Sequence, residues 1–456
     1  MRQTILFLAM IAPMSVHADE VKFIRKPTVK AVDGTFEVSF AVSQTTDVEV
    51  AIVDKGGRVV RHLTAGVIGG EVNPLPPLKT GLSQTLAWDG KDDDGKPAVR
   101  GPFTAQVRAG LTSKLGAMIA NPAEINPSPH YNRLFGLATD EGGPIPIKAM
   151  DMAFDDQGRL YLYGQAGWRE PIYRCDREFK PVPFPATGEP TTHLTLAEDS
   201  EGKRLPVYGR YGTGWSNKGI DIGPDGRIYV RCMYDWNKYF VTVFKPDGTA
   251  EKHDRIQGGI LGPLSEGSGG IRIDRARFFY VGTDGFPAGT PNAHQWSSSI
   301  VKVKPDGGGI AQLPDPKEGE EPGRVDPERG IVFEDYLFDG AVTAYPRMSP
   351  RQDRGCVCKE ARFDIDQFGR LYVPDVLQFC IHVYDNQGNW ITDIGHYGNC
   401  DAMGNGSGPP IPFGWPMSCS INNAGRLYVA DVLNHRVVRV DPLYAAEVAC
   451  DVLASQ

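Results

Sequence analysis

Hydrophobic and polar residues alternate along much of this chain, in short runs separated by turns that contain glycine and aspartate. Residues 36–42 (FEVSFAV) and 48–53 (VEVAIV) show the alternation clearly, and residues 55–58 (KGGR) supply a hairpin turn after them. A period of two predicts half-buried strands, because successive side chains of a strand point to opposite faces. The pattern therefore predicts an all-β protein built from many short strands.

A longer pattern repeats in the second part of the chain. Residues 362–378 (RFDIDQFGRLYVPDVLQ) correspond to residues 418–434 (SCSINNAGRLYVADVLN) at a spacing of 56 residues, and weaker copies begin near residues 152, 220 and 271. Each copy predicts an inner strand, a tight turn and an aromatic strand, and further strand patterns follow. Four antiparallel strands that recur roughly every 50–70 residues are typical of a β-propeller blade.

The number of blades follows from the spacing of these copies. Five are recognisable, but the interval between Arg275 and Phe368 is too long for one blade, and residues 330–337 (GIVFEDYL) supply a candidate for a degenerate sixth. We predict six blades, with five or seven as the alternatives. A strand from residues 113–147 is expected to close the ring by joining the last blade.

The last copy resembles an NHL repeat. Residues 425–441 (GRLYVADVLNHRVVRVD) match the D-x-x-N-x-R-V signature of that family, whereas Gln378 and Cys380 replace its Asn and Arg in the preceding copy. The three upstream copies lose the signature. The resemblance implies an NHL-like propeller over residues 113–456. It implies no single function, because relatives bind RNA or protein, hydrolyse lactones or cleave peptidyl-hydroxyglycine.

Residues 21–112 differ from the repeat region, and their closely spaced turns predict a small β-sandwich. Residues 52–61 (IVDKGGRVVR) and 88–97 (WDGKDDDGKP) resemble the immunoglobulin-like domain of flagellar-hook-capping proteins. Such domains are mostly spacers or adaptors. The acidic loop in the second motif lacks the ligand spacing of an EF-hand, so we expect a tight hairpin there in place of a calcium site.

Residues 1–18 combine a basic start, an apolar stretch (ILFLAMIAPM) and a small-residue cleavage pattern. They predict a secretory signal peptide, and hence a secreted or periplasmic protein of bacterial type. The eight cysteines of such a chain favour disulfide bonds, with a metal site at Cys356 and Cys358 as the alternative.

Charge and hydropathy exclude two classes of partner. The formal net charge is −8 and no basic stripe occurs, which argues against nucleic acid as a partner. No apolar run of 18 residues follows the N-terminal segment, so we expect no membrane insertion of the mature chain.

An enzyme of this fold would carry His, Asp or Glu on the inner strands around its axial channel. No histidine recurs at one repeat position, and neither H-E-x-x-H nor G-x-S-x-G occurs, so no catalytic residue is assigned. Asp375 and Asp431 do recur, and we expect structural carboxylates that cap a loop or pair with Arg436. No cofactor is predicted, although a divalent metal in the channel stays open as an alternative.

The loops after the aromatic strands should all leave the propeller on one face, and three of them carry a tryptophan with polar neighbours. Tryptophan side chains suit stacking on a sugar or contact with a protein, although each of them would also fill a gap between adjacent blades. We therefore predict a secreted module that binds an extracellular glycan or protein, with an extracellular metal-dependent lyase or hydrolase as the alternative. The candidate ligand-binding residues are Trp168, Arg169, Tyr234, Trp236, Asn237, His294, Trp296, Asn434 and His435.

Overall fold

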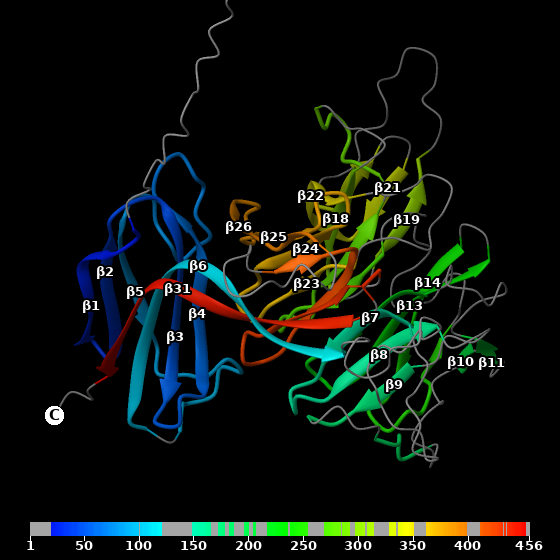
Figure 1. The fold of residues 1–456 in the computed structure, drawn as a ribbon, viewed down its shortest axis with the longest axis horizontal. Helices are drawn as coiled ribbons and strands as arrows, with labels where there is room; N and C mark the ends of the chain where they lie inside the picture. The colour runs from blue at the N-terminus through cyan, green and yellow to red at the C-terminus, as the bar shows by residue number, and fades with distance from the viewer. Residues whose placement is uncertain are drawn as a thin grey trace, which may run out of the picture.

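The fold is seen in a computed structural model, in which every regular element of the described residues is a β-strand (Figure 1). No helix in this part of the chain is long and apolar enough to cross a membrane. The described residues are 20–99, 101–120, 148–165, 172–177, 182–186, 196–199, 204–206, 217–235, 238–253, 269–283, 285–291, 297–305, 308–313, 328–333, 336–350, 362–398, 411–431, 433–434 and 436–452.

The N-terminal body consists of two facing sheets. One sheet has the order β1-β2-β5, and the other contains β4, β3 and β6. Val38 and Trp88 of the first sheet and Val50 and Val107 of the second are buried in one common core. This two-layer packing is the predicted β-sandwich architecture, while the immunoglobulin-like assignment stays a prediction. The strands are β1 (Phe23–Val32), β2 (Thr35–Val42), β3 (Thr46–Asp54), β4 (Val59–Ile68), β5 (Ser83–Trp88) and β6 (Phe103–Ala120).

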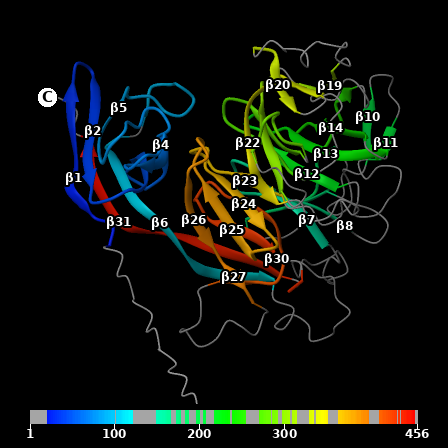
Figure 2. The ribbon, with the colours of Figure 1, turned by 90° about the horizontal axis from the view of Figure 1, so that it is seen from above.

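The second body is a ring of sheets around an axis (Figure 2). Its inner strands β7, β12, β16, β23 and β29 neighbour one another in sequence order, and β29 packs against β7 to close the ring. The strands of the five sheets are β7 (Lys148–Phe154), β8 (Leu160–Gln165), β9 (Ile172–Cys175), β12 (Asn217–Ile222), β13 (Ile228–Asp235), β14 (Lys238–Phe244), β16 (Ile271–Ile273), β17 (Phe279–Thr283), β18 (Ser297–Val303), β22 (Ala341–Pro350), β23 (Asp364–Ile365), β24 (Leu371–Asp375), β25 (Cys380–Tyr384), β26 (Trp390–Ile394), β29 (Pro416–Ile421) and β30 (Leu427–Asp431), with β31 (Arg436–Val452) and part of β6 completing the last sheet.

The described residues form five blades, and the predicted sixth is wrong. Residues 330–337 belong to a three-stranded sheet of β19 (Gly309–Gln312), β20 (Gly330–Phe333) and β21 (Tyr336–Asp339). The strands β18 and β22 on either side of it pair with each other in the third blade. The long interval is therefore an insertion between two strands of one blade. Strand periodicity predicts a strand there, but it carries no information on whether that strand reaches the axis.

Three short sheets and pairs complete the described strands. The sheet β11-β10-β15 lies beside β14, and β27 and β28 form a parallel pair next to the last blade. Their bounds are β10 (Leu196–Asp199), β11 (Arg204–Pro206), β15 (Lys252–His253), β27 (His396–Tyr397) and β28 (Pro412–Phe413).

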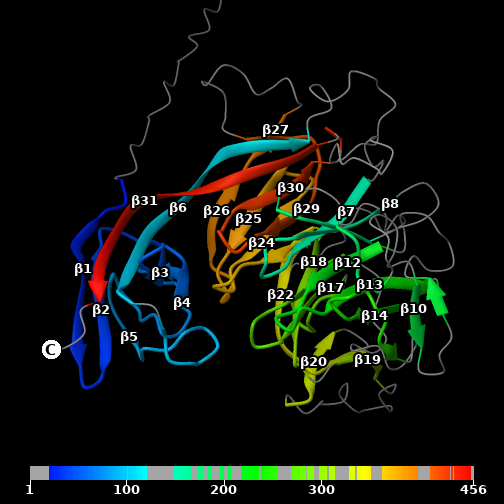
Figure 3. The same ribbon diagram turned by 90° about the horizontal axis from the view of Figure 1, so that it is seen from below.

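A long two-stranded ribbon of β6 and β31 joins the two bodies (Figure 3). The first part of β6 pairs with β3 of the N-terminal body, and residues 113–120 pair with β31 beside β30. These residues supply the outer strand of the last blade, so the predicted closing strand is confirmed. The second part of β31, residues 444–452, returns to the N-terminal body, which therefore extends beyond the predicted boundary at residue 112.

The tight turns inside the repeats form as predicted. In each blade the turn needs a residue with positive φ, and glycine, which lacks a Cβ atom, adopts this conformation without steric cost. Gly158, Gly226, Gly369 and Gly425 have φ between 71° and 82°, and Arg277 takes the same place in the third blade with φ of 68°. These turns align all five hairpins on one face of the ring.

The predicted disulfides are absent from the four cysteines whose side chains the structure describes. Cys175, Cys380 and Cys419 are buried free thiols, and Cys450 is a half-buried one. The thiols of Cys175 and Cys419 lie in two different hydrophobic clusters of the ring. Cys356, Cys358 and Cys400 lie outside the described residues, and Cys232 in β13 is described without its side chain.

Candidate functional site

Most of the predicted ligand-binding residues cannot be placed. The position of Tyr234 in β13 is described without its side chain, and Asn434 is the one candidate with a described side chain. The others stay predictions, because they lie outside the described residues: Trp168, Arg169, Trp236, Asn237, His294, Trp296 and His435.

Asn434 takes part in a clamp around a buried carboxylate. Its Nδ2 donates to Asp431 Oδ2 at 2.6 Å and to the carbonyl of Gly398 at 3.0 Å. Asp431 also accepts hydrogen bonds from the backbone N–H of Trp415 and from Arg436 Nε, at 2.8 and 3.0 Å. The predicted structural role of Asp431 is confirmed, and the corresponding Asp375 likewise caps its own loop.

The face that carries the hairpin turns encloses a cavity of about 680 Å³ on the axis, which we call the axial cavity. Asp93, Asp94 and Lys96 of the N-terminal body line its opposite side. The second residue of each hairpin turn also lines it, and these residues are Asp156, Pro224, Arg275, Gln367 and Asn423. The repeat thus places five different side chains around one opening.

Hydrogen bonds connect these turn residues into a rim. Arg275 Nε donates to Gln367 Oε1 at 2.6 Å, and Gln367 Nε2 donates to Asn423 Oδ1 at 3.3 Å. Asn423 Nδ2 donates onward to the carbonyl of Asp156 at 3.3 Å. The rim therefore holds one guanidinium group and two amide groups in fixed orientations around the cavity.

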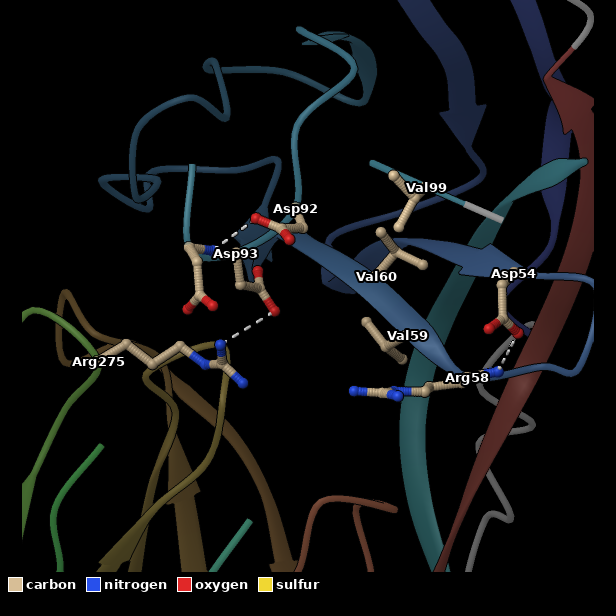
Figure 4. A pocket seen from close by; sticks show the side chains of 9 residues that line it. Asp54, Arg58, Val59, Val60, Asp92, Asp93, Val99 and Arg275 are labelled. Atoms are coloured by element: carbon tan, nitrogen blue, oxygen red, sulfur yellow. Dashed lines mark hydrogen bonds and ion pairs between the residues drawn. The ribbon is translucent and has the colours of Figure 1, made fainter. Parts of the chain in front are cut away.

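Arg275 ties the rim to the N-terminal body. Figure 4 shows it reaching toward Asp93, whose Oδ2 lies 3.5 Å from one guanidinium nitrogen of Arg275. The same arginine lines a smaller cavity of about 270 Å³ beside Asp54 and Arg58, and a larger one of about 700 Å³ that also contains Gln367. The axial cavity therefore belongs to a cleft between the two bodies, with Arg275 at its centre.

Beneath the axial cavity, one arginine occupies the axis. Arg272 is fully buried, and its Nε donates to Asp364 Oδ1 at 2.7 Å. Its two terminal nitrogens donate to the two oxygens of Asp151 at 2.9 and 3.0 Å. Bidentate pairs of this kind fix geometry as well as charge. The third blade is thereby bonded to the first and fourth blades through the centre of the ring.

Inner-strand carboxylates also link each blade to the next. Asp151 accepts a hydrogen bond from the backbone N–H of Ile220 at 2.9 Å, and Asp221 accepts one from Ile273 at 2.6 Å. Asp364 accepts a hydrogen bond from the backbone of the last blade in the same way. These contacts satisfy N–H groups that the sheets themselves leave unpaired.

Two carboxyl groups face the axial cavity from its floor. Burial raises the pKa of Asp221 to about 8, although the nearby charge of Arg272 opposes this shift. Burial also raises the pKa of Asp364 to about 6, although the charge of Arg272, which donates a hydrogen bond to Asp364, opposes this shift. A pKa of about 8 keeps Asp221 mostly protonated at neutral pH, whereas Asp364 is mostly ionised.

The residues at the axis do not fit a divalent metal. Asp151 and Asp364, whose oxygens converge there, are engaged by Arg272, which already supplies a positive charge. The inner strands, as far as the structure describes them, contain no histidine. A metal-dependent reaction in the channel therefore has no donor set among the described residues.

One position of the repeat carries a sequence signal for this site. Aligned copies of the repeat place Asp221, Arg272, Asp364 and Ser420 at one position, between apolar neighbours. A charged residue at an inner-strand position of a propeller points to the axis, whatever its type. No single residue type marks this position, because its residues differ from blade to blade.

Comparisons with known proteins yield distant similarities of shape. No family model matches the chain, and no curated protein matches it. A gluconolactonase from Xanthomonas campestris is 14% identical, with a TM-score of 0.34, and the match covers 92% of this chain and 98% of that one. A streptogramin B lyase is 9% identical, with a TM-score of 0.28 and coverage of 93% and 97%. A Bacteroides thetaiotaomicron protein of unknown function is 13% identical, with a TM-score of 0.36 and coverage of 92% and 99%.

These neighbours are β-propeller proteins, but such low values carry no argument about the activity of this chain. The NHL and immunoglobulin-like resemblances therefore stay predictions.

Proposed function

We propose that the protein binds a neutral carbohydrate in the axial cavity. The hydrogen-bonded rim carries the proposal, since Gln367 and Asn423 present amide groups that both donate to and accept from sugar hydroxyls. The carboxylate of Asp156 adds acceptor atoms. Acidic side chains outnumber lysine and arginine around the cavity, which disfavours an anionic ligand.

Aromatic side chains support the same class of ligand. Phe154, Tyr280 and Phe368 line the axial cavity among these polar groups. A sugar ring has apolar C–H faces and polar edges, so it is matched by aromatic faces beside amides and carboxylates. A volume of about 680 Å³ suits a small saccharide or the end of a longer chain. Together with the signal peptide predicted over residues 1–18, this favours a secreted protein that meets an extracellular glycan.

The test is binding of a panel of neutral mono- to tetrasaccharides by isothermal titration calorimetry. We expect Asn423→Ala and Gln367→Ala each to weaken binding about tenfold, which corresponds to the loss of one or two good hydrogen bonds. Gln157→Ala is the matched control, because Gln157 lies in a turn of the same kind but does not line the cavity. Its affinity should equal that of the wild type.

Two results would contradict the proposal. One is the absence of binding across the panel. The other is a saccharide whose affinity falls in alanine variants of Trp168, Trp236 or Trp296 but not in the rim variants. In the sequence these tryptophans follow β8, β13 and β17, and the repeat predicts that their loops leave the ring on the face remote from the hairpin turns. That pattern would assign the ligand to the other face of the ring.

A second candidate is a glycan hydrolase or lyase that works without a metal. The raised pKa of Asp221 favours it, because a carboxyl group protonated at neutral pH on a cavity floor can act as a general acid. Asp221→Asn keeps an oxygen for the backbone bond from Ile273 but removes the acid. If the candidate is right, this variant binds the saccharide and fails to turn it over.

A further inference from the structure

A second polar cluster lies on the fourth blade, at the end of the strands remote from the hairpin turns. Cys380 and His382 are two residues apart on β25, so their side chains share one face of the sheet. Asp375 of β24 is paired with Cys380, and Asp393 of β26 is paired with His382. Directly opposite residues also share a face, so the ladder gathers all four side chains together.

The distances between these groups are short. Cys380 Sγ lies 3.8 Å from His382 Nδ1, and Asp393 Oδ1 lies 2.6 Å from the same nitrogen. One ligand atom from each of the three residues lies within 4.8 Å of the others. On the other side of the imidazole ring, His382 Nε2 lies 3.3 Å from Asp375 Oδ2.

We propose that Cys380, His382 and Asp393 bind one divalent cation of the zinc class. Bonds of about 2.3 Å to sulfur and about 2.0–2.1 Å to nitrogen place tetrahedral ligand atoms roughly 3.5 Å apart. The separation of Cys380 Sγ and His382 Nδ1 is close to this value. When the cation binds, the hydrogen bond between His382 and Asp393 is replaced by one metal bond to each residue. The side chain of Asp393 is half exposed and has room to move outward.

The remaining groups suit the supporting roles of such a site. Asp375 accepts a hydrogen bond from His382 Nε2, so that Nδ1 faces the metal, as outer carboxylates do for metal-bound imidazoles. Trp390 Nε1 donates to Asp393 Oδ1 at 2.9 Å and orients that carboxylate. A thiolate, an imidazole and a carboxylate together select zinc or cobalt over calcium or magnesium.

Among the described residues this cluster occurs on the fourth blade alone, and none of its members lines the axial cavity. In the last blade, Arg436 and Val438 occupy the places of Cys380 and His382. Among the described residues three side chains supply ligands, and the fourth tetrahedral position then goes to water, which is the arrangement of zinc sites that perform chemistry or accept an external ligand. This inference does not depend on the carbohydrate proposal.

The experiment titrates the full chain, reduced and free of chelator, with Co²⁺ and with Zn²⁺. We expect one Co²⁺ per chain with a thiolate-to-cobalt charge-transfer band, and displacement of Co²⁺ by Zn²⁺. Cys380→Ser should abolish the band, and Asp375→Asn should weaken zinc binding about 10–100-fold. Cys450→Ser is the matched control, because that thiol is in the N-terminal body, and it should keep the band.

Asp393→Asn tests metal binding with little risk of unfolding the protein, since the carboxylate of Asp393 is half exposed. It should reduce affinity while the far-ultraviolet circular dichroism stays that of the wild type. The proposal is overturned if no stoichiometric metal binds, or if the band survives in Cys380→Ser. If Cys380→Ser loses both the band and the native dichroism spectrum, the variant has unfolded. The titration of Asp393→Asn then decides whether the cluster binds the metal.

Discussion

At the level of single residues, Arg272 shows how strongly one position shapes the centre of the ring. Its guanidinium is bonded to Asp151 and Asp364, and Asp221 lies beside it without a direct ion pair. Breaking a buried ion pair leaves an uncompensated charge, which is why such networks tolerate little change. The unequal sharing of one arginine explains why Asp221 holds its proton at a higher pH than Asp364.

The pKa of Asp221 makes a prediction about stability. The folded value of about 8 lies above the ordinary value of 3.8, so the folded state binds more protons than the unfolded state between these pH values. The free energy of unfolding therefore falls as the pH rises through this window. Between pH 6 and pH 8 we expect the free energy of unfolding to fall less in Asp221→Asn than in the wild type. The difference between the two decreases should be on the order of 1–3 kcal/mol.

Urea unfolding at pH 6, 7 and 8 measures this difference. Asp225→Asn is the control, because hydrogen bonds from Arg227 outweigh partial burial and hold the pKa of Asp225 below 3.8. Its stability should parallel that of the wild type over the same range. Parallel curves for Asp221→Asn and the wild type would show that Asp221 is ionised in the folded protein.

At the level of strands, the ribbon of β6 and β31 is the element that unites distant parts of the chain. Each strand begins in one body and ends in the other, and the two pair along nearly their whole length. The first part of β6 lies between β3 and β31 in the N-terminal sheet. Without residues 444–452, this part of β6 would become an edge strand with unpaired backbone groups.

Removal of the chain after Leu443 tests the role of this strand. We expect the melting temperature of the N-terminal body to fall by roughly 5 °C or more, because a complete row of ladder hydrogen bonds is lost. The exposed edge should also promote association, which size-exclusion chromatography detects. A chain that ends at Val452 is the control and should behave as the wild type. Equal melting temperatures for both chains would contradict the prediction.

At the level of the whole molecule, buried polar contacts hold the two bodies together. Glu49 of β3 accepts hydrogen bonds from Arg370 of the fourth blade at 2.7 Å and from Tyr444 at 2.5 Å. Burial opposes ionisation of Glu49, but the charge of Arg370 outweighs it and lowers the pKa of this carboxyl. Asp385 of the same blade accepts a hydrogen bond from the backbone of Val67. These contacts bond the two bodies to each other beside the cleft that contains the axial cavity.

Glu49→Gln tests this coupling. The substitution leaves Arg370 buried beside Asp366 alone, and we expect a loss of about 3–5 kcal/mol. Calorimetry should show one transition for the wild type and an earlier separate transition for one body in the variant. Glu447→Gln is the control: its exposed pairing with Arg108 at 3.4 Å should contribute about 0–1 kcal/mol. A single, unshifted transition in Glu49→Gln would show that the bodies are held by other contacts.

Several features were predictable because they are local. The turn glycines, the apolar alternation and the 56-residue spacing are each written within a few dozen residues, and they predicted hairpins, an all-β fold and repeated blades. The closing strand was predictable too, since a ring of blades needs one. Asp431 could be assigned to a structural role because it recurs as Asp375 one repeat earlier and because Arg436 follows it closely in the sequence.

The remaining features depend on contacts between residues far apart in the chain. Whether residues 330–337 reach the axis is decided by the pairing of β18 with β22 around them. The axial cavity needs one turn residue from each blade and a loop of the N-terminal body, and Arg275 acquires its place there from Asp93 and Gln367. The cluster at Cys380 forms because strand pairing sets Asp393 beside His382.

The sequence by itself therefore determined the strands, their turns and the repetition of the blades, since these follow from backbone preferences and side-chain alternation. The tertiary structure alone decided the count of blades, the return of β31 to the N-terminal body and the two polar sites. These depend on how the ring closes, and closure is a balance of packing between distant strands that no local pattern records.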